Sequence, residues 1–197
     1  MNFLKKIFKT SDESSNDNDD QEKVSLSLDD SFVHNFIKRG GKFLYCLKKE
    51  DVTKNLLNII EENNWDSLTF NNKDLHTYIA SINIKTESKF NTNTPLFTTC
   101  EYLISENGSL LFSSNQIKEK RVSTLTNDFI VLATTSQIVK NTGESLTGIK
   151  VKYSGKDLPT NISPIKNYTT HSNIDENFLN YGTNNSKNLY LLLLEDL

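Results

Sequence analysis

Apolar residues occur in short bursts along this chain, and two spacings recur among them. Apolar residues three or four positions apart predict helices, because that spacing places them on one helix face. Short unbroken apolar runs predict strands, and a run that is apolar throughout predicts a strand buried on both faces, as in a parallel sheet. Helical spacing falls near residues 29–39, 50–63, 74–83 and 144–153, and strand-like segments near 42–46, 65–70, 128–134, 161–165 and 188–195. This alternation predicts a layered α/β domain.

Residues 100–114 predict an antiparallel hairpin within this fold. Two strand-like runs flank the pair Asn107-Gly108, which is the strongest short signal for a hairpin turn. The expected turn is type I′, in which both central residues have a positive φ. Such a turn would place Glu106 beside Ser109 at the end of the hairpin.

The N-terminal residues differ in composition from the rest. Residues 1–9 are basic and amphipathic but lack the long apolar core of a secretory signal. They predict either the start of a disordered tail or a short helix that docks on the body or on a partner. Residues 11–22 contain only Ser, Asp, Asn, Glu and Gln, so they have no apolar surface to bury and are expected to be disordered. We therefore expect a tail over residues 1–27 and one folded domain over residues 28–197.

Charge and hydropathy narrow the classes of function. The 197 residues carry a formal net charge of -3, so the charge does not point to nucleic acid. No apolar run approaches the roughly 20 residues that span a bilayer, so no membrane span is expected. The two cysteines, Cys46 and Cys100, lie far apart inside apolar segments. They predict buried, reduced thiols in a cytoplasmic protein, and two thiols do not supply the usual four ligands of an iron–sulfur cluster.

The familiar catalytic motifs are missing from the sequence. It contains no Gly-rich phosphate loop, no HExxH metal motif and no GxSxG nucleophile motif, and we expect no metal site. His34 and His76 fall in predicted helices off the apolar face, so both are expected on the surface. His171 lies in a polar loop and is the one histidine that we consider for a binding site.

Glu106 is the best single candidate for chemistry. At a rigid hairpin end its carboxylate could act as a base, a nucleophile or a ligand-binding group. Alternatively, it is a polar residue beside an exposed turn. Arg121 presents a similar choice, because its guanidinium could bind a carboxylate or phosphate in fork geometry or form a surface ion pair.

The order of these features resembles the LUD domain, which occurs in bacterial lactate-utilisation proteins of the B and C type. Residues 106–109 read Glu-Asn-Gly-Ser where the family has a Glu-Thr-Gly-Thr-like segment. Arg121 and the apolar strand at 129–133 follow in the same order. The resemblance extends from about residue 32 to residue 197 and includes the C-terminal apolar run.

This resemblance implies the fold of the NagB, RpiA and CoA-transferase superfamily: a Rossmann-like mixed sheet with flanking helices, here with an inserted β-hairpin. It implies an accessory role beside iron–sulfur partner proteins that oxidise L-lactate to pyruvate. The C-type member carries no cluster of its own, which agrees with the cysteine count, so no cofactor is expected to bind this chain directly. The alternative is a stand-alone enzyme, similar to CoA transferases or to 5-formyltetrahydrofolate cyclo-ligase, in which Glu106 is the catalytic carboxylate.

The sequence departs from the family in two segments. Residues 167–175 keep only the Ile-Asp end of a Gly-Pro-Ser-Arg-Thr-Ala-Asp-Ile-Glu-like segment and lose its arginine. Residues 180–184 keep the glycine of a Gly-Val-His-Gly-Pro-like segment, at Gly182, and lose its histidine. These losses favour the accessory role over the stand-alone enzyme.

A binding site is expected outside the carboxyl ends of the strands, where open α/β sheets bind ligands. The hairpin end with Glu106, Arg121 and the loop at 167–175 would converge there on one cleft for a small anionic ligand. Gly182 would let the backbone approach the ligand closely, because it has no Cβ. The expected ligand-binding residues are Gly108, Ser109, Arg121, His171 and Gly182.

Overall fold

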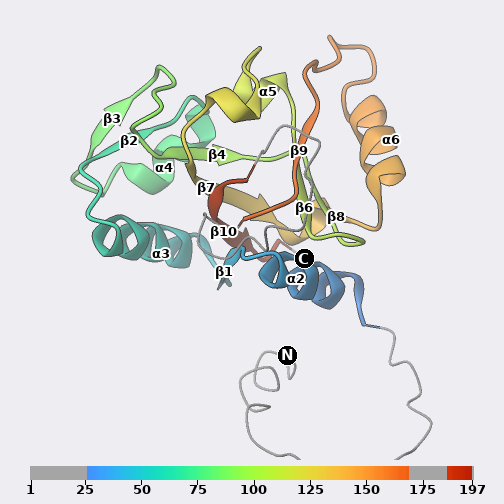
Figure 1. Cartoon of the computed structure of the whole chain (residues 1–197), viewed down its shortest axis with the longest axis horizontal. Coiled ribbons are helices and arrows are strands. Elements are labelled where there is room, and N and C mark those ends of the chain that lie inside the picture. Colours follow the sequence, from blue (N-terminus) through green and yellow to red (C-terminus); the bar gives the residue numbers. More distant parts are fainter. Residues whose placement is uncertain (1–25, 169–185, 197) are drawn as a thin grey trace, which may run out of the picture.

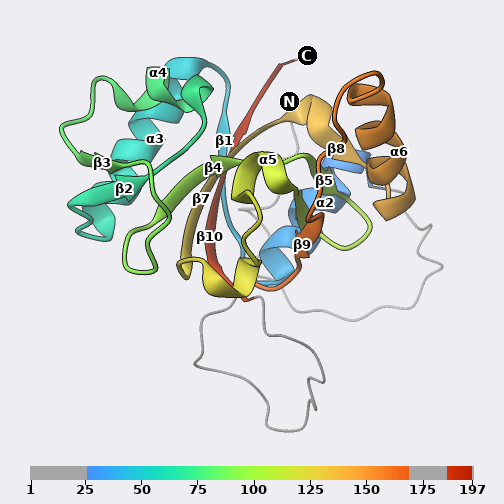
Figure 2. The same ribbon diagram turned by 90° about the horizontal axis from the view of Figure 1, so that it is seen from above.

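The computed structural model describes residues 26–168 and 186–196, which form two sheets with helices around them (Figures 1 and 2). Most of the predicted N-terminal tail lies outside the described residues, as do His171 and Gly182. Among the residues described, no helix has the length and apolar character needed to cross a membrane.

The larger sheet has six strands in the order β1-β10-β7-β4-β2-β3, and every neighbouring pair is parallel. The strands are β1 (Lys42–Cys46), β2 (Ser67–Thr69), β3 (Lys85–Glu87), β4 (Leu96–Thr99), β7 (Asp128–Thr134) and β10 (Asn188–Leu194). β10 pairs with β7 along its whole length, from Asn188 opposite Asp128 to Leu194 opposite Thr134. The two longest apolar runs of the chain are therefore neighbours inside the sheet.

Alternation along β7 divides the core into two clusters, one on each face of the larger sheet. Ile130 and Leu132 lie in the cluster that α3 (Lys49–Glu62) and α4 (His76–Ile79) cover. Phe129 and Val131 lie in the opposite cluster, which contains α2 (Leu28–Lys38) and the second sheet. Successive side chains of a strand point to opposite faces, so a run that is apolar throughout buries both.

The second sheet has four strands in the order β8-β5-β6-β9. They are β5 (Tyr102–Ile104), β6 (Ser109–Phe112), β8 (Ile138–Val139) and β9 (Ser163–Ile165). Helix α6 (Thr142–Lys152) covers its outer side, where Ile149 packs with Ile104 and Leu111. The short elements between strands are η1 (Lys73–Leu75), α5 (Ser114–Ile117), η2 (Val122–Thr124) and η3 (Thr135–Gln137). Figure 2 shows the second sheet between the larger sheet and α6.

Side-chain caps set where two of the helices begin. Ser27 Oγ accepts a hydrogen bond from the Asp30 N–H at 3.1 Å, so Ser27 caps α2. Asn141 Oδ1 accepts from the Glu144 N–H at 3.0 Å at the start of α6. Both arrangements satisfy a backbone donor that has no partner within the helix.

The predicted α/β class with a Rossmann-like sheet and flanking helices is confirmed. The antiparallel hairpin is present, but its strands belong to the second sheet, so the larger sheet is parallel throughout the described residues. One local prediction was wrong. The helical spacing at 74–83 yields only η1 and α4.

The hairpin turn also differs from the predicted type I′ turn. Ile104 pairs with Ser109, which leaves residues 105–108 as the loop, and Glu106 does not lie opposite Ser109. Of these four residues only Gly108 has a positive φ, +63°. The N–H groups of Ser105 and Glu106 donate to the carbonyls of Val139 and Lys140, so both residues bond to the β8 segment instead of pairing with β6.

Candidate functional site

Polar side chains gather at the carboxyl edge of the larger sheet, just after its strands end. Asn71 follows β2, Glu101 follows β4, Thr135 follows β7 and Asp196 follows β10. The carboxyl ends of parallel strands meet at one edge, and open α/β sheets bind ligands there. This edge is therefore the candidate functional site.

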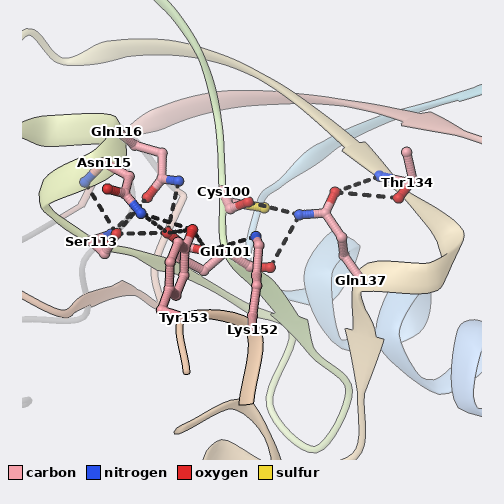
Figure 3. A network of polar contacts seen from close by, with 9 residues as sticks. All are labelled: Cys100, Glu101, Ser113, Asn115, Gln116, Thr134, Gln137, Lys152 and Tyr153. Atoms are coloured by element: carbon pink, nitrogen blue, oxygen red, sulfur yellow. Dashed lines mark hydrogen bonds and ion pairs between the residues drawn. The ribbon is translucent and has the colours of Figure 1, made fainter. Parts of the chain in front are cut away.

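Glu101 is the most enclosed of these side chains, with 1% of its surface exposed. Its Oε1 accepts hydrogen bonds from Ser113 Oγ at 2.7 Å, Asn115 Nδ2 at 3.0 Å and Gln116 Nε2 at 3.1 Å (Figure 3). All three donors come from the start of α5. A buried carboxylate needs such partners, because an unpaired charge in the interior is costly.

A capping box at the start of α5 orients the side chains that donate to Glu101. Ser113 is the N-cap of α5, and its N–H donates to Gln116 Oε1 at 2.8 Å. The amide of Gln116 is thereby held at its oxygen, and its nitrogen faces Glu101. A local sequence rule, Ser followed three residues later by Gln, thus prepares the carboxylate's environment.

The last turn of α6 supplies the remaining contacts of Glu101. Lys152 Nζ lies 3.1 Å from its Oε2, and the Tyr153 hydroxyl lies 3.2 Å from each oxygen. Half of the Lys152 side chain is exposed, so solvent can reach this end of the cluster. The contact joins α6 to the residue that follows β4.

Glu101 and Lys152 are both charged at neutral pH. Burial alone would raise the pKa of Glu101, but hydrogen bonds from Ser113, Gln116 and the other donors outweigh it and hold the pKa below 4.5. Burial would lower the pKa of Lys152, and its contact with Glu101 raises it above 10.5 instead. The carboxylate in this ion pair is covered by its partners. The cluster is therefore better placed to hold α5 and α6 together than to attack a substrate.

A second set of contacts joins the ends of β4, β7 and β10. Gln137 Nε2 donates to the carbonyls of Cys100 at 2.7 Å and Glu101 at 3.1 Å, while its Oε1 accepts from the Thr134 N–H. Asp196 accepts from the Ser136 N–H at 2.9 Å and from its hydroxyl at 2.6 Å. Slight burial acts to raise the pKa of Asp196, but these bonds dominate and lower it to about 2.

Glu106 lies away from this cluster, exposed, at the start of the hairpin loop. It lines a groove of about 340 Å³ together with Lys140, Ser31 and the residues that begin α2. Gly108 and Ser109 are buried, and Gly108 is packed against the backbone of Phe36 in α2. They hold the loop in place and leave Glu106 accessible.

The fold does not place Arg121 beside Glu106. It is exposed and precedes η2, whose Thr124 donates to the Arg121 carbonyl. Glu106 lies before β6 and Arg121 lies beyond its other end, and no contact among the described residues joins them. His171 and Gly182 lie outside the described residues, so their predicted place in the cleft stays a prediction.

Sequence reasoning missed Glu101 and its partners as a cluster. Glu101 sits between two apolar strand segments, and a charged residue in such a place is a signal of a buried, paired carboxylate. The Ser113-Gln116 capping box was also readable. The contact with Lys152 was not, because that residue is 51 positions further along the chain.

Metal-ligating side chains do not cluster among the described residues, where no group of three or more His, Cys, Asp or Glu could hold an ion. Cys46 and Cys100 are free and buried, as predicted. They lie in the two different core clusters, on opposite faces of the larger sheet.

Comparison with known proteins identifies the family to which the chain belongs. A family model described as the LUD domain matches residues 30–194. Among solved structures, the chain is similar to a DUF162 family protein from Deinococcus radiodurans, with 11% sequence identity, a TM-score of 0.59, and coverage of 87% of this chain and 100% of the other. At that identity the likeness shows the fold alone. No curated protein sequence matches significantly. Because the family match spans most of its length, the chain belongs to the LUD domain family.

Proposed function

We propose that this chain is an accessory component of lactate utilisation. It works in the cytoplasm with iron–sulfur partner proteins that oxidise L-lactate to pyruvate, and it binds no cluster itself. The two electrons that leave lactate pass to the clusters of the partners. Membership of the LUD family over residues 30–194 is the observation that carries this proposal.

The positions of the cysteines support the part of the proposal that concerns the cluster. An iron–sulfur cluster is usually held by four cysteine thiolates. Here Cys46 and Cys100 are each covered and lie on opposite faces of the larger sheet. Burial raises the pKa of both thiols, which disfavours the thiolate that binds iron.

Growth of a deletion strain tests the role. Without this chain the host should fail to grow on L-lactate and should grow normally on pyruvate, which bypasses the oxidation. Wild-type chain and the Glu106→Gln variant should both restore growth, because the accessory role does not use a Glu106 nucleophile. Growth of the deletion strain on L-lactate at the wild-type rate would refute the proposal.

One observation favours a second candidate, the stand-alone CoA-transferase-like or 5-formyltetrahydrofolate cyclo-ligase-like enzyme. Glu106 is accessible and shares its groove with the Lys140 side chain. As a nucleophile, its carboxylate would attack an acyl-CoA thioester, form an acyl-glutamyl anhydride and release CoA as the thiolate. Incubation of the purified chain with acetyl-CoA and succinate tests this reaction. The enzyme hypothesis requires turnover that Glu106→Gln abolishes and that Glu61→Gln, on the exposed side of α3, leaves unchanged.

A further inference from the structure

β1 forms one edge of the larger sheet, with β10 as its neighbour on the inner side. The Glu195 N–H donates to the carbonyl of Cys46 at 2.9 Å, so the backbone groups of Cys46 face β10. Alternate residues of a strand direct their N–H and C=O groups to opposite sides, so those of Phe43 and Tyr45 face outward. No hydrogen bond from another described residue reaches them. Such groups are a template for a further strand.

Proteins usually protect an edge of this kind, and the other three edges of the two sheets are protected. β3 is three residues long and begins with Lys85, β8 has two residues, and β9 contains Pro164, which has no N–H. β1 has five residues and no proline. Its lysine, Lys42, is directed toward β10, where Nζ donates to the Tyr190 hydroxyl at 2.7 Å. Within the described part of the chain, β1 is therefore the one unprotected edge.

Apolar side chains lie on both faces of this edge. Phe43 and Tyr45 are half-buried against the core cluster that contains α2, and Leu44 is half-buried against the cluster that α3 covers. Figure 1 shows β1 between these two helices. Leu47, directly after the strand, is 54% exposed. An added strand would cover apolar surface as well as bond to the backbone.

Charge divides the edge into a basic end and an acidic end. α2 packs against β1 and is joined to it by a short turn, so the two run antiparallel and Lys38, in the last turn of α2, lies at the Lys42 end. The first turn of α2, with Asp29, lies at the Tyr45 end. Burial, a hydrogen bond with Glu195 and the charges of Glu195 and Asp29 raise the pKa of Tyr45 to about 12, so both carboxylates lie near its hydroxyl.

The open backbone groups end after one residue on either side of Leu44. The Gly41 N–H donates to the carbonyl of Phe36, and the Leu47 N–H donates to Asp51 Oδ2 at 3.1 Å. Only Phe43 and Tyr45 remain to bond to an added strand. This pattern is symmetric about Leu44, and the charges at the two ends are opposite. An identical edge that runs in the opposite direction therefore matches both.

We propose that the β1 edge binds the β1 edge of a second copy of this chain, antiparallel and about a two-fold axis at Leu44. Phe43 then lies opposite the partner subunit's Tyr45, and the two exchange a pair of backbone hydrogen bonds. Leu44 meets the partner's Leu44 on the axis. The arrangement closes, so it joins the two larger sheets and leaves no open edge between them. The inference rests on the fold and not on the role in lactate utilisation.

Light scattering during size-exclusion chromatography of the full chain should give the mass of two chains at about 100 µM. Amide hydrogen exchange of the ¹⁵N-labelled dimer locates the contact. The Phe43 and Tyr45 amides should exchange at least about tenfold more slowly than that of Thr86. Thr86 is the matched control, because its neighbours Lys85 and Glu87 bond to the β2 side and its own N–H faces outward from β3. A mass of one chain, or equally fast exchange at all three amides, would overturn the proposal.

Charge exchange at position 44 tests the axis. Leu44→Glu and Leu44→Lys each place like charges directly opposite each other, so each should raise the Kd of the dimer at least about tenfold. An equal mixture of the two variants should restore dimers, because a carboxylate then meets an ammonium. Val151→Glu makes a similar change on the exposed side of α6 and should leave the Kd unchanged.

Two results of this experiment would also overturn the proposal. One is a Leu44→Glu dimer as tight as wild type, and the other is a mixture that stays monomeric although both variants keep the circular dichroism of wild type. If the variants do not fold, the exchange rates of Phe43 and Tyr45 in the wild-type chain decide. None of these results bears on growth on L-lactate, so the two proposals fail separately.

Discussion

The Glu101 carboxylate is almost completely shielded from water, and five side chains from α5 and α6 and their caps donate hydrogen bonds to it. Each hydrogen bond alone would stabilise the fold only slightly, because it replaces a hydrogen bond that the same group makes with water in the unfolded chain. Together they keep the carboxylate ionised against its desolvation. Glu101 therefore stabilises the fold by joining α5 to α6. Its removal would leave the hydrogen-bond donors and the Lys152 ammonium without their acceptor.

The change Glu101→Ala should lower the free energy of unfolding by about 3 kcal/mol, the loss expected when one partner of a buried pair is removed. Urea unfolding followed by circular dichroism measures it. Glu61→Ala on the exposed side of α3 is the matched control and should change stability by less than about 0.5 kcal/mol. Equal effects of the two variants would show that the Glu101 cluster does not stabilise the fold.

Acid should remove the contribution of this charge. The pKa of Glu101 is below 4.5 in the folded chain, so its ionised form stabilises the fold above that pH, and the stabilisation is lost as pH falls through the folded pKa. The difference in unfolding free energy between wild type and Glu101→Gln should therefore be largest at neutral pH and shrink in acid. A difference that stays constant from neutral pH to strong acid would contradict the assignment.

Elements whose apolar pattern matches their burial were predictable. β7 and β10 are apolar at nearly every position because both faces are covered. β3 was not predictable, because Lys85-Thr86-Glu87 is polar and is a strand only through its parallel pairing with β2. The type of hairpin turn was missed for a similar reason: the N–H groups of residues 105 and 106 bond to the β8 segment, a tertiary contact, and β5 ends at Ile104.

The hairpin loop depends on Gly108 for two reasons, its positive φ and its contact with the α2 backbone. A Cβ at this position would collide with backbone atoms of Phe36 and Asn35, which cannot rotate away. Gly108→Ala should therefore cost about 3 kcal/mol, from strain and overpacking together. Thermal unfolding with calorimetry measures this loss.

Gly155→Ala is the control that separates the two causes. Gly155 also has a positive φ, +73°, but nothing lies within 4 Å of an added Cβ. This variant should lose only about 1 kcal/mol, the cost of the backbone conformation. If the two alanine variants are equally stable, the close approach of the hairpin to α2 contributes nothing.

At the scale of the molecule, one edge of the larger sheet connects the features described above. Asn71, which follows β2, donates to the Gln116 carbonyl, and the Gln116 side chain donates to Glu101. Sequence patterns predicted the fold that creates this edge. They did not predict which side chains meet there, because Asn71, Gln116 and Lys152 come from three distant parts of the chain, and Glu106 and Arg121, which are near in sequence, stay apart.

We propose that this LUD protein acts beside iron–sulfur proteins and carries no cluster of its own. The sharpest test is anaerobic affinity purification of the tagged chain from cells grown on L-lactate, with iron and acid-labile sulfide measured before and after the complex is separated. We expect a cysteine-rich partner that retains all of the iron and sulfide, and a chain that is free of both. Purification of the chain alone, or with the cluster bound to it, would refute the proposed role.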